Sequence, residues 1–474
     1  MTPAVGSPLV LEVGLAALMV IIFFAGVFAR GQDRRHGGVI CAVGLVVLFG
    51  IGWRAEPGGA LFGGSFVQDQ LAIFAKQLFL LATIIGVLGS LALRAPTFAR
   101  RATEYYLAIL ASLMGMLVLA SARDLVLLFV AFELMSIPLY YLAGFLKREA
   151  DAVEAALKFF LVGTVSSAVL VYGLSFVYGV AGTTDLRGIA AALAGGHPLM
   201  SLGMILALAG LGFKIAAFPF HMWVPDTYEA ASTPFVAWLS VAPKAAGFMV
   251  IFRLYLEGVG DRVMLWVPLA AGLATVTIIG GNLMAIPQQN VKRLLAYSGI
   301  AHIGYMLVGF AAVSANGVAM MLFYLVAYLF GNMGAFLVVE AVAQSEGSES
   351  IAAYRGLAQR SPVLALSMLL FLLSLGGIPF VAGFWAKLYV FWAAAEQGLY
   401  GLVLVGAILT VVALFYYLLV AKRMYIDAPE KTGPVAVTPF LKLSIFLCVL
   451  GVVGMGLYPK PFVMAALRAA SGLF

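Results

Sequence analysis

Five ionisable side chains lie deep inside long apolar stretches of the sequence: Glu133, Lys214, Lys244, His302 and Lys387. A charged side chain at the centre of a bilayer-spanning helix costs ~2.5–3.5 kcal/mol on insertion scales. A single such residue could belong to a structural ion pair, but five on different stretches fit that explanation poorly. Intramembrane ionisable residues usually mark ion pathways or proton relays, and we expect one here.

Four of these five groups can be cationic and one is a carboxylate, so they cannot all be paired and charged together. Burial disfavours the charged form of a group, whereas a nearby opposite charge favours it. A buried lysine with a movable carboxylate partner would therefore gain a proton when the partner approaches and lose it when the partner withdraws. His302 could simply be a hydrogen-bonded packing residue, but histidine, with a reference pKa of ~6.5, is equally suited to passing protons between lysines.

Two prolines, Pro219 and Pro379, interrupt long apolar stretches, and each is followed by phenylalanine. Proline inside a helix removes a hydrogen bond and kinks or breaks the helix. Within a membrane, the freed backbone groups are tolerated only where they are buried in protein or line a water-filled cavity. Each break is therefore predicted to line a hydrated cavity, with Lys214 shortly before the first break and Lys387 shortly after the second.

The stretches that carry these residues are long enough to cross a membrane. The chain of 474 residues is 64% hydrophobic and 10% charged, whereas soluble domains are usually ~45–50% apolar and ~25% charged. A spanning helix needs ~20 mostly apolar residues, and that window predicts an all-α polytopic membrane protein with about fourteen spans. They lie near residues 9–29, 38–53, 69–93, 104–122, 124–146, 153–180, 199–220, 234–257, 263–285, 292–313, 318–342, 361–395, 400–424 and 438–458.

Basic residues are concentrated in the loops after odd-numbered spans, for example at Arg34, Arg35, Lys292 and Arg293. Because short basic loops stay in the cytoplasm, both chain termini are predicted to lie on the periplasmic or outer side. Several other charged residues lie near span ends, where long side chains can reach the interface. Most of this group is expected to do so: Glu12, Asp69, Lys76, Lys158, Glu340 and Lys442.

The two predicted breaks divide the chain into repeats. Residues 104–257 hold spans four to eight, residues 258–424 hold spans nine to thirteen, and each five-helix block has its broken helix in fourth place. Since five is odd, the second block starts on the opposite side of the membrane, as in the inverted repeats of secondary transporters. Residues 1–103 then form three N-terminal spans, and residues 425–474 form the last span and a tail.

Cofactor motifs are missing from the sequence. Cys41 and Cys448 lie in apolar stretches near opposite ends of the chain, so no disulfide framework is expected. No Cys or His cluster has metal-ligand spacing, and no dinucleotide- or phosphate-binding motif is present. The basic residues form no stripe, so nucleic-acid binding is not expected either.

Five stretches together resemble the antiporter-like subunits of respiratory NADH:quinone oxidoreductase (complex I). They are FELMSIPLY at 132–140, EAALKFFLVGTVSSAVLVYG at 154–173, FKIAAFPFHMWVPDTYEAASTPFVAWLSVAPKAA at 213–246, QQNVKRLLAYSGIAHIGYML at 288–307 and GGIPFVAGFWAK at 376–387. Within that family the chain is most similar to subunit N, the counterpart of mitochondrial subunit 2, partly because the second broken helix carries a lysine. One departure is Ala-Ala-Ser at 230–232, where the family tends towards Gly-Ala-Pro.

The resemblance implies a relay. Glu133 would be the carboxylate partner of Lys214, Lys244 would connect towards His302, and Lys387 would be the terminal proton site. Lys158 matches a family lysine and would join the central hydrophilic axis, so the resemblance weakens its expected interfacial position.

The resemblance also implies a proton-translocating subunit in a bacterial inner membrane, driven by quinone reduction in other subunits. No cofactor is then expected in this chain, and NAD, FMN, iron–sulfur clusters and quinone are expected in partner subunits of the complex. The expected partners of the chain itself are other membrane-arm subunits and the lipid bilayer. Two alternatives remain open: an autonomous or multi-subunit cation/proton antiporter, and a passive structural membrane subunit.

Overall fold

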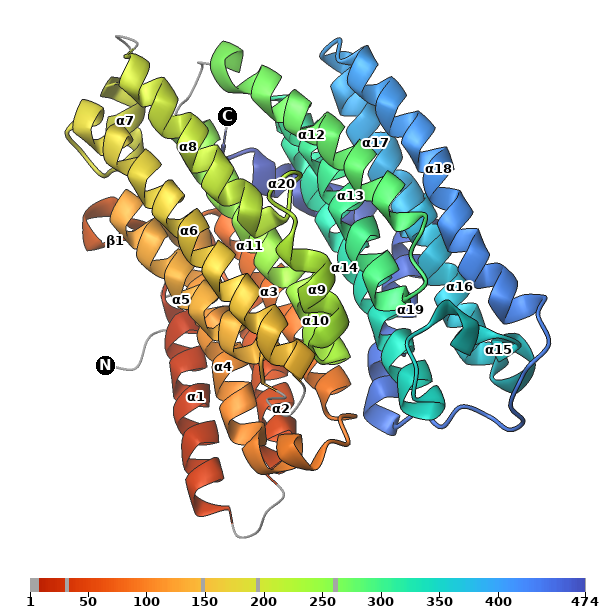
Figure 1. Cartoon of the computed structure of the whole chain (residues 1–474). Coiled ribbons are helices and arrows are strands. Elements are labelled where there is room, and N and C mark those ends of the chain that lie inside the picture. The colour runs from red at the N-terminus through yellow and green to blue at the C-terminus, as the bar shows by residue number, and fades with distance from the viewer. Residues whose placement is uncertain (1–7, 30–33, 146–149, 193–196, 259–262, 474) are drawn as a thin grey trace.

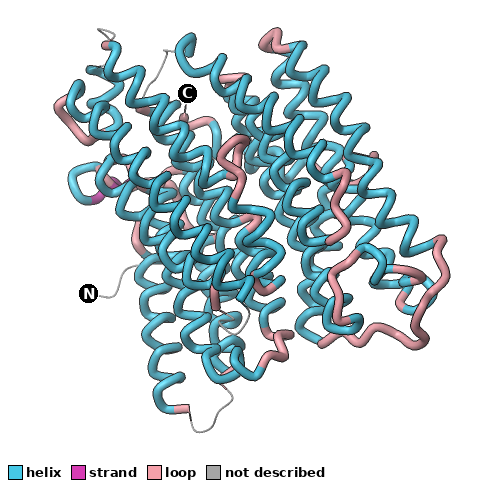
Figure 2. Tube along the Cα trace, viewed as in Figure 1, coloured by secondary structure: helices cyan, strands magenta, loops and turns pink. Residues whose placement is uncertain are grey.

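The computed structural model describes residues 8–29, 34–145, 150–192, 197–258 and 263–473. Most of these residues are helical, and the loops lie mainly at the helix ends (Figure 2). One short hairpin pairs β1 (Ala60–Leu61) with β2 (Phe66–Val67), and the 3-10 turn η1 (Phe62–Gly64) connects the two strands. The predicted all-α class is therefore confirmed apart from this hairpin.

The helices of the first half are α1 (Val10–Phe28), α2 (His36–Gly52), α3 (Gln70–Ser90), α4 (Pro96–Ser121), α5 (Leu125–Ala143), α6 (Ala150–Ala181), α7 (Leu186–Ala192), α8 (Pro198–Ile215), α9 (Trp223–Ala230), α10 (Thr233–Leu239), α11 (Ala242–Ile251) and the π-helix η3 (Phe252–Glu257). Those of the second half are α12 (Val263–Ala285), α13 (Val291–Ala311), α14 (Ala315–Glu346), η4 (Ile351–Tyr354), α15 (Leu357–Arg360), α16 (Pro362–Gly376), α17 (Ala382–Glu396), α18 (Tyr400–Tyr425), α19 (Pro439–Leu457) and α20 (Lys460–Ala470).

Several helices begin at a side chain that caps them. Asp69 accepts a hydrogen bond from the backbone N–H of the third residue after it and so starts α3. Asp124, Asn290 and Ser314 do the same for α5, α13 and α14. Caps of this kind satisfy N–H groups that have no partner within the helix.

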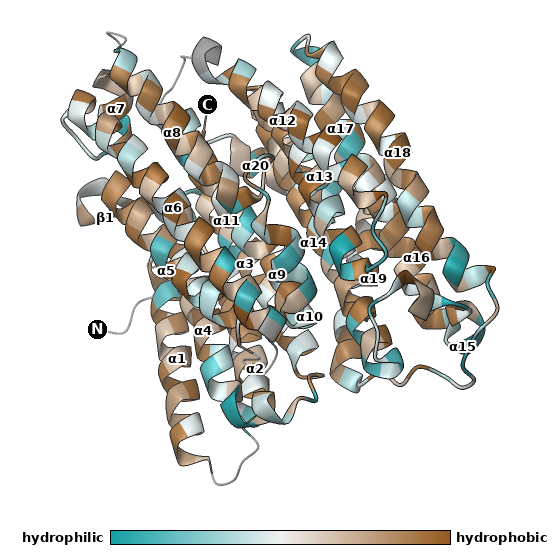
Figure 3. Ribbon diagram, viewed as in Figure 1, coloured by the Kyte–Doolittle hydropathy of each residue, from teal (hydrophilic) through white to brown (hydrophobic). Residues whose placement is uncertain are grey.

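Twelve helices among the described residues are long and apolar enough to cross a membrane. The predicted count of about fourteen stays a prediction, because two of its members correspond to the shorter apolar helices α2 and α16. Outer helices such as α18 carry exposed apolar side chains, including Leu404 and Val411, as expected of a surface in contact with lipid (Figure 3). The chain is thus a multi-span membrane protein.

Helices α4–α11 and α12–α18 form two groups that lie side by side (Figure 1). The 32-residue helix α14 joins them, because it packs against α3 and α10 on one side and against α13, α16 and α17 on the other. Its most apolar window is entirely buried inside the protein. Polar residues on α14 are therefore shielded from lipid by their neighbours.

Both proline-containing stretches are non-helical. α8 ends at Ile215, Ala216 takes a left-handed conformation at φ 64°, and Pro219 lies between α8 and α9. α16 ends at Gly376, and Pro379 lies between α16 and α17. There Gly377 has φ 81°, a value that glycine adopts without a steric penalty.

Three interfacial expectations are wrong, because Glu12, Lys76 and Glu340 are all buried. Lys76 and Glu12 form an ion pair of 2.7 Å between α3 and α1. The pair satisfies both charges inside the protein, so neither side chain needs to reach the membrane surface.

Candidate functional site

The first break positions Lys214 beside α5. The buried Lys214 ammonium donates a hydrogen bond of 2.6 Å to the Ser136 hydroxyl and lies 5.2 Å from the centre of the Phe132 ring. Glu133, one turn before Ser136 on α5, accepts a 2.6 Å hydrogen bond from Ser167 of α6. The two serines thus hold the lysine and the carboxylate separately. Within the described chain no ion pair joins Glu133 to Lys214, although the carboxylate acts on the ammonium electrostatically.

Lys244 follows a third helix break, which the sequence analysis missed. Ser240 and Val241 separate α10 from α11, and Lys244 lies in the first turn of α11. The Ser240 hydroxyl accepts a 2.7 Å hydrogen bond from the Asn332 amide of α14, which fastens the break to the central helix. Pro243 was the available signal, because proline favours the first turn of a new helix.

The Lys244 ammonium is 1% exposed by residue and has no hydrogen-bond partner among the described residues. It lies 5.3 Å from the centre of the Tyr228 ring. Three further buried polar atoms in the same region also have no hydrogen-bond partner in the part of the chain that the structure describes: the hydroxyls of Tyr228 and Tyr328 and the amide oxygen of Asn332. Buried polar groups are nearly always hydrogen-bonded, so water is the partner that can satisfy this cluster.

His302 lies on α13 between two tyrosines. Its Nδ1 is 2.7 Å from the Tyr324 hydroxyl of α14, and its Nε2 is 3.2 Å from the Tyr417 hydroxyl of α18. The Tyr417 hydroxyl is in turn 2.5 Å from that of Ser298. Both ring nitrogens therefore have a hydroxyl that can donate or accept, so the imidazole can change tautomer without losing a partner.

Lys387 of α17 spans the second break and contacts the end of α16. Its buried ammonium donates hydrogen bonds to the carbonyl oxygens of Leu375 at 2.9 Å and Gly376 at 3.4 Å, the last residues of α16. It also lies 4.7 Å from the centre of the Tyr305 ring. The last carbonyls of a helix lack intrahelical partners and carry partial negative charge, so the break itself supplies a site for a cation.

Neutral polar side chains connect His302 with Tyr305. The Tyr417 and Tyr416 rings lie 4.5 Å apart, the Tyr416 hydroxyl donates to the Asn282 amide oxygen at 3.0 Å, and the Asn282 amide donates to the Tyr305 hydroxyl at 3.2 Å. The sequence analysis missed these residues because it searched only for ionisable groups. The only signal was a buried asparagine and several tyrosines within apolar spans.

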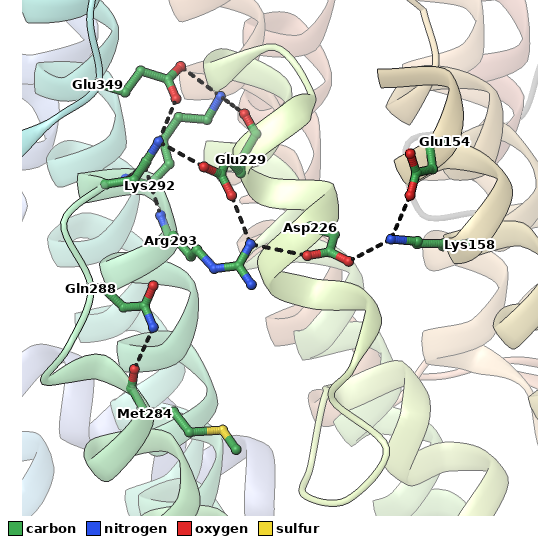
Figure 4. A network of polar contacts seen from close by, with 10 residues as sticks. Glu154, Lys158, Asp226, Glu229, Met284, Gln288, Lys292, Arg293 and Glu349 are labelled. Carbon is green, nitrogen blue, oxygen red and sulfur yellow. Dashed lines mark hydrogen bonds and ion pairs between the residues drawn. The ribbon is translucent and has the colours of Figure 1, made fainter. Parts of the chain in front are cut away.

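Lys158 lies apart from the buried groups. Its side chain is 50% exposed and forms ion pairs with Glu154 at 2.9 Å and Asp226 at 3.2 Å. Figure 4 shows that this pair continues into a network that also joins Arg293 and Glu229. The structure therefore brings together Glu133 with Lys214, and His302 with the groups near Lys244 and Lys387, but places Lys158 at the surface.

A buried ion cluster lies at the opposite end of the helices. Arg253, which is 0% exposed, pairs with Asp69 and Glu257, and Arg123 pairs with the same two carboxylates. Burial by itself would raise the pKa of Asp69, but the hydrogen bond and charge of Arg253 outweigh it and lower that pKa. Two cations and two carboxylates cancel here, which is typical of a structural cluster.

Among the described residues, no group of three or more His, Cys, Asp or Glu side chains could hold a metal ion. Cys41 and Cys448 are both buried and form no disulfide. The site is thus composed of lysines, a carboxylate, a histidine and hydroxyl groups, which can hold and pass protons.

Comparison with known proteins identifies the family. The family model described as NADH:quinone oxidoreductase/Mrp antiporter, TM, matches residues 122–413. NADH-quinone oxidoreductase subunit N of Moorella thermoacetica is 41% identical over 471 residues, which cover 98% of each chain. The same subunit of Heliobacterium modesticaldum is 40% identical over 475 residues, which cover 99% of each chain.

Solved structures of related complexes also match this chain over nearly its full length. A chain of respiratory complex I from Thermus thermophilus with bound aureothin matches at a TM-score of 0.82 and 31% identity, covering 96% of this chain and 98% of that one. A chain of the Mrp complex from Dietzia sp. matches at a TM-score of 0.87 but 20% identity, covering 98% and 97%, and so shows only a shared fold. The relatives over nearly the full length are subunit N proteins, and the chain accordingly belongs to the subunit N family of NADH-quinone oxidoreductases.

Proposed function

We propose that this chain is a proton-translocating membrane subunit of an NADH-quinone oxidoreductase, driven by quinone reduction in other subunits. Family membership supports the assembly, and the buried ionisable groups support the proton chemistry. The observation that carries the proposal most directly is Lys387, an ammonium buried at the exposed carbonyl end of a broken membrane helix. A buried lysine at such a place can accept and release a proton because helix carbonyls stabilise only its charged form.

The proposed relay begins with Glu133 and Lys214. Movement of the Glu133 carboxylate from Ser167 towards Lys214 would stabilise the charged ammonium, and its return would favour release of the proton. The proton then passes through Lys244 and His302 to Lys387, using water beside Lys244 and the hydroxyl groups beyond His302. Lys158 takes part at the surface end, where the ion-pair network meets water.

We also propose the inverted repeat, with residues 104–257 and 258–424 as its two units. In both units the first two helices pack together, as α4 with α5 and α12 with α13. In both, the third helix packs against the broken fourth one, as α6 with α8 and α14 with α17. Residues 1–103 and 425–474 flank the repeats.

The proposed orientation puts both termini outside a bacterial inner membrane, since the basic loops would lie in the cytoplasm. Partner subunits of the membrane arm adjoin the chain, and NAD, FMN, iron–sulfur clusters and quinone reside in other subunits. This chain contributes proton binding and transfer.

The test is NADH-driven proton translocation by the complete complex in proteoliposomes. Lys214→Ala and Lys387→Ala should each abolish most of the translocation while the complex still assembles. Lys442→Ala, which removes an exposed lysine on α19, is the control and should leave translocation unchanged. Normal translocation in both site variants would refute the relay, and loss of assembly in both would favour a passive structural subunit.

The alternative of a cation/proton antiporter gains support from the fold shared with the Mrp complex. It predicts proton movement that depends on sodium and proceeds without NADH. Translocation that requires NADH and persists in sodium-free buffer would exclude it.

A further inference from the structure

Helix α14 carries a polar stripe along its buried length. The residues at every fourth position from 324 to 344 are Tyr324, Tyr328, Asn332, Phe336, Glu340 and Gln344. Side chains four residues apart are neighbours on a helix surface, each offset by about 40° from the last, so these six form one continuous ridge that winds around α14. Phe336 is the only member without a polar atom. The ridge starts at His302, which Tyr324 contacts, and runs towards the end of α14 that holds Glu340.

Glu340 lines a cavity of about 620 Å³. The surface side of that cavity is formed by the ion-pair network of Lys158, Asp226, Glu229 and Glu349, most of which Figure 4 shows. Because Lys158 is half exposed, the cavity is continuous with the protein surface. The cavity thus leads from the surface to a buried carboxylate.

Glu340 differs from three other carboxylates of the cavity. Asp226, Glu229 and Glu349 pair with Arg293 or Lys292. Glu340 is only 6% exposed and accepts a 2.6 Å hydrogen bond from the neutral amide of Gln344. Within the described chain it forms no ion pair. The positive charge of Lys292 acts on it, but that ammonium is itself paired with Glu349, so the Glu340 carboxylate can still take up a proton.

Beyond Glu340, one apolar contact separates the cavity from the cluster around Lys244. The Phe336 ring meets the edge of the Tyr228 ring, with their centres 5.8 Å apart. On the far side lie the atoms that have no hydrogen-bond partner among the described residues, namely the hydroxyls of Tyr228 and Tyr328, the Asn332 amide oxygen and the Lys244 ammonium.

Gly299 of α13 keeps these groups close together. A Cβ atom at position 299 would lie 2.8 Å from the Tyr328 hydroxyl oxygen and 3.6 Å from the Lys244 nitrogen. The hydroxyl and the ammonium therefore border the same small space, which any larger residue would fill. Water in this space would join them by hydrogen bonds.

We propose that Glu340 is the residue through which protons reach the relay from the cavity, and that the α14 stripe delivers them to Lys244. Glu340 takes a proton from water in the cavity and gives it to water beside Asn332 and Tyr328, from which the Lys244 amine receives it. Only O–H and N–H bonds form and break, and the Phe336–Tyr228 contact closes the route when water is absent there. This inference rests on the proposed function and adds the access route.

The decisive variant is Glu340→Gln in the complete complex, reconstituted in proteoliposomes and assayed per assembled complex for NADH-driven proton translocation. We expect the rate to fall roughly tenfold or more, since a positioned proton-transfer group typically contributes ~10²-fold or more. Glu340→Asp should recover most of the rate because it restores a carboxylate. The control is Glu396→Gln on α17, whose exposed carboxylate accepts a 2.8 Å hydrogen bond from Trp392 outside the cavity, and it should stay within about twofold.

A second variant distinguishes a proton-transfer role of Glu340 from a purely structural one. Asn332→Leu keeps the side-chain size but removes the polar atoms in the middle of the stripe, and it should slow translocation as Glu340→Gln does. Equal losses in Glu340→Gln and Glu340→Asp would indicate a structural role and overturn the proposal. Normal rates in both Glu340→Gln and Asn332→Leu, with a loss in Lys244→Ala, would refute the access route and leave the relay standing. Normal rates in all three would refute the proposed function itself.

Discussion

Ser136 holds Lys214 at 2.6 Å, while Glu133, one turn earlier on the same helix, is held by Ser167. The two members of the proposed switch are thus neighbours with different partners. In the proposed switch this arrangement would be the separated state, and the two serines would set how easily the charged groups approach each other.

Ser167→Ala should shift the equilibrium between separated and paired Glu133 and Lys214 towards the paired state. It removes the hydrogen bond that keeps Glu133 away from Lys214, and hydrogen bonds to charged groups contribute ~1.5–3 kcal/mol. We expect Lys214 to retain its proton longer and NADH-driven translocation to slow by roughly 10- to 150-fold, the range to which that energy corresponds. Ser175→Ala is the control, because Ser175 lies on the same helix, is exposed and donates only to its own helix. An unchanged rate in Ser167→Ala would mean that Ser167 does not govern the pair.

Lys387→Met should stop translocation and leave the fold intact. Methionine fills a similar volume but cannot donate to the carbonyl oxygens of Leu375 and Gly376. We expect a loss of roughly 10²-fold in NADH-driven translocation, the usual contribution of a proton-transfer group. Lys442→Met on the exposed face of α19 should have no effect. A complex that fails to assemble would instead show that the ammonium is needed to hold the break.

Tyr417→Phe tests the hydroxyl groups beyond His302. The variant removes one oxygen that contacts both His302 and Ser298 but keeps the ring packed on Tyr416. Translocation should slow by about tenfold or more, because the remaining gap must be bridged by water. Tyr389→Phe is the matched control, since the Tyr389 ring stacks on Trp385 away from His302. Equal rates in the two variants would exclude Tyr417 from the path.

Lys158→Met should have a smaller effect than variants of the three buried lysines Lys214, Lys244 and Lys387. The side chain is half exposed and paired with Glu154 and Asp226, and such pairs contribute only ~0–1 kcal/mol. We expect translocation within about twofold of the unmodified complex. A loss as large as that of Lys214→Ala would show that Lys158 belongs to the central relay after all.

Asp69→Asn should destabilise the protein in a pH-dependent way. The change leaves the fully buried Arg253 short of a partner, which costs roughly 3–5 kcal/mol when a buried pair is broken. The pKa of Asp69 is lowered below its ordinary value of 3.8, so its stabilising effect is complete above pH 3.8 and disappears as the pH falls through the folded-state pKa. Thermal unfolding of the purified complex should show a lower Tm for Asp69→Asn than for the unmodified protein at pH 7. The difference in Tm should disappear in acid. A constant difference down to the lowest pH would contradict this assignment.

The lysines of the site could be found from the sequence because a charge inside an apolar stretch is visible without any structure. Lys214, Lys244 and Lys387 are all buried in the structure. The tyrosines around His302 could not be found this way, since tyrosine is common in apolar helices and only tertiary packing decides which rings meet.

The interfacial prediction for Glu12 and Lys76 was wrong because it rested only on their distance from the end of a span. Their depth suited an interfacial position, but α1 and α3 pack side by side and pair the two charges internally. Similarly, the sequence showed no difference between Glu340 and the other residues near span ends. Its burial depends on α14 lying at the centre of the protein. The break before Lys244 was missed because the apolar stretch continues through it without a change of composition.

Two hydrogen-bonded groups of α17 connect the halves of the second broken helix: the Gly383 N–H, which donates to the Ser374 hydroxyl of α16 at 3.0 Å, and the Lys387 ammonium. Lys387 belongs to α17, whereas the carbonyl oxygens that it contacts belong to α16. A hydrogen bond from a charged donor is roughly twice as strong as one from a neutral donor, so this connection is firm only while the proton is present. In the proposed relay, departure of the proton would weaken this contact between α16 and α17, so a chemical event at one atom would change how firmly the two halves of a membrane helix are held together.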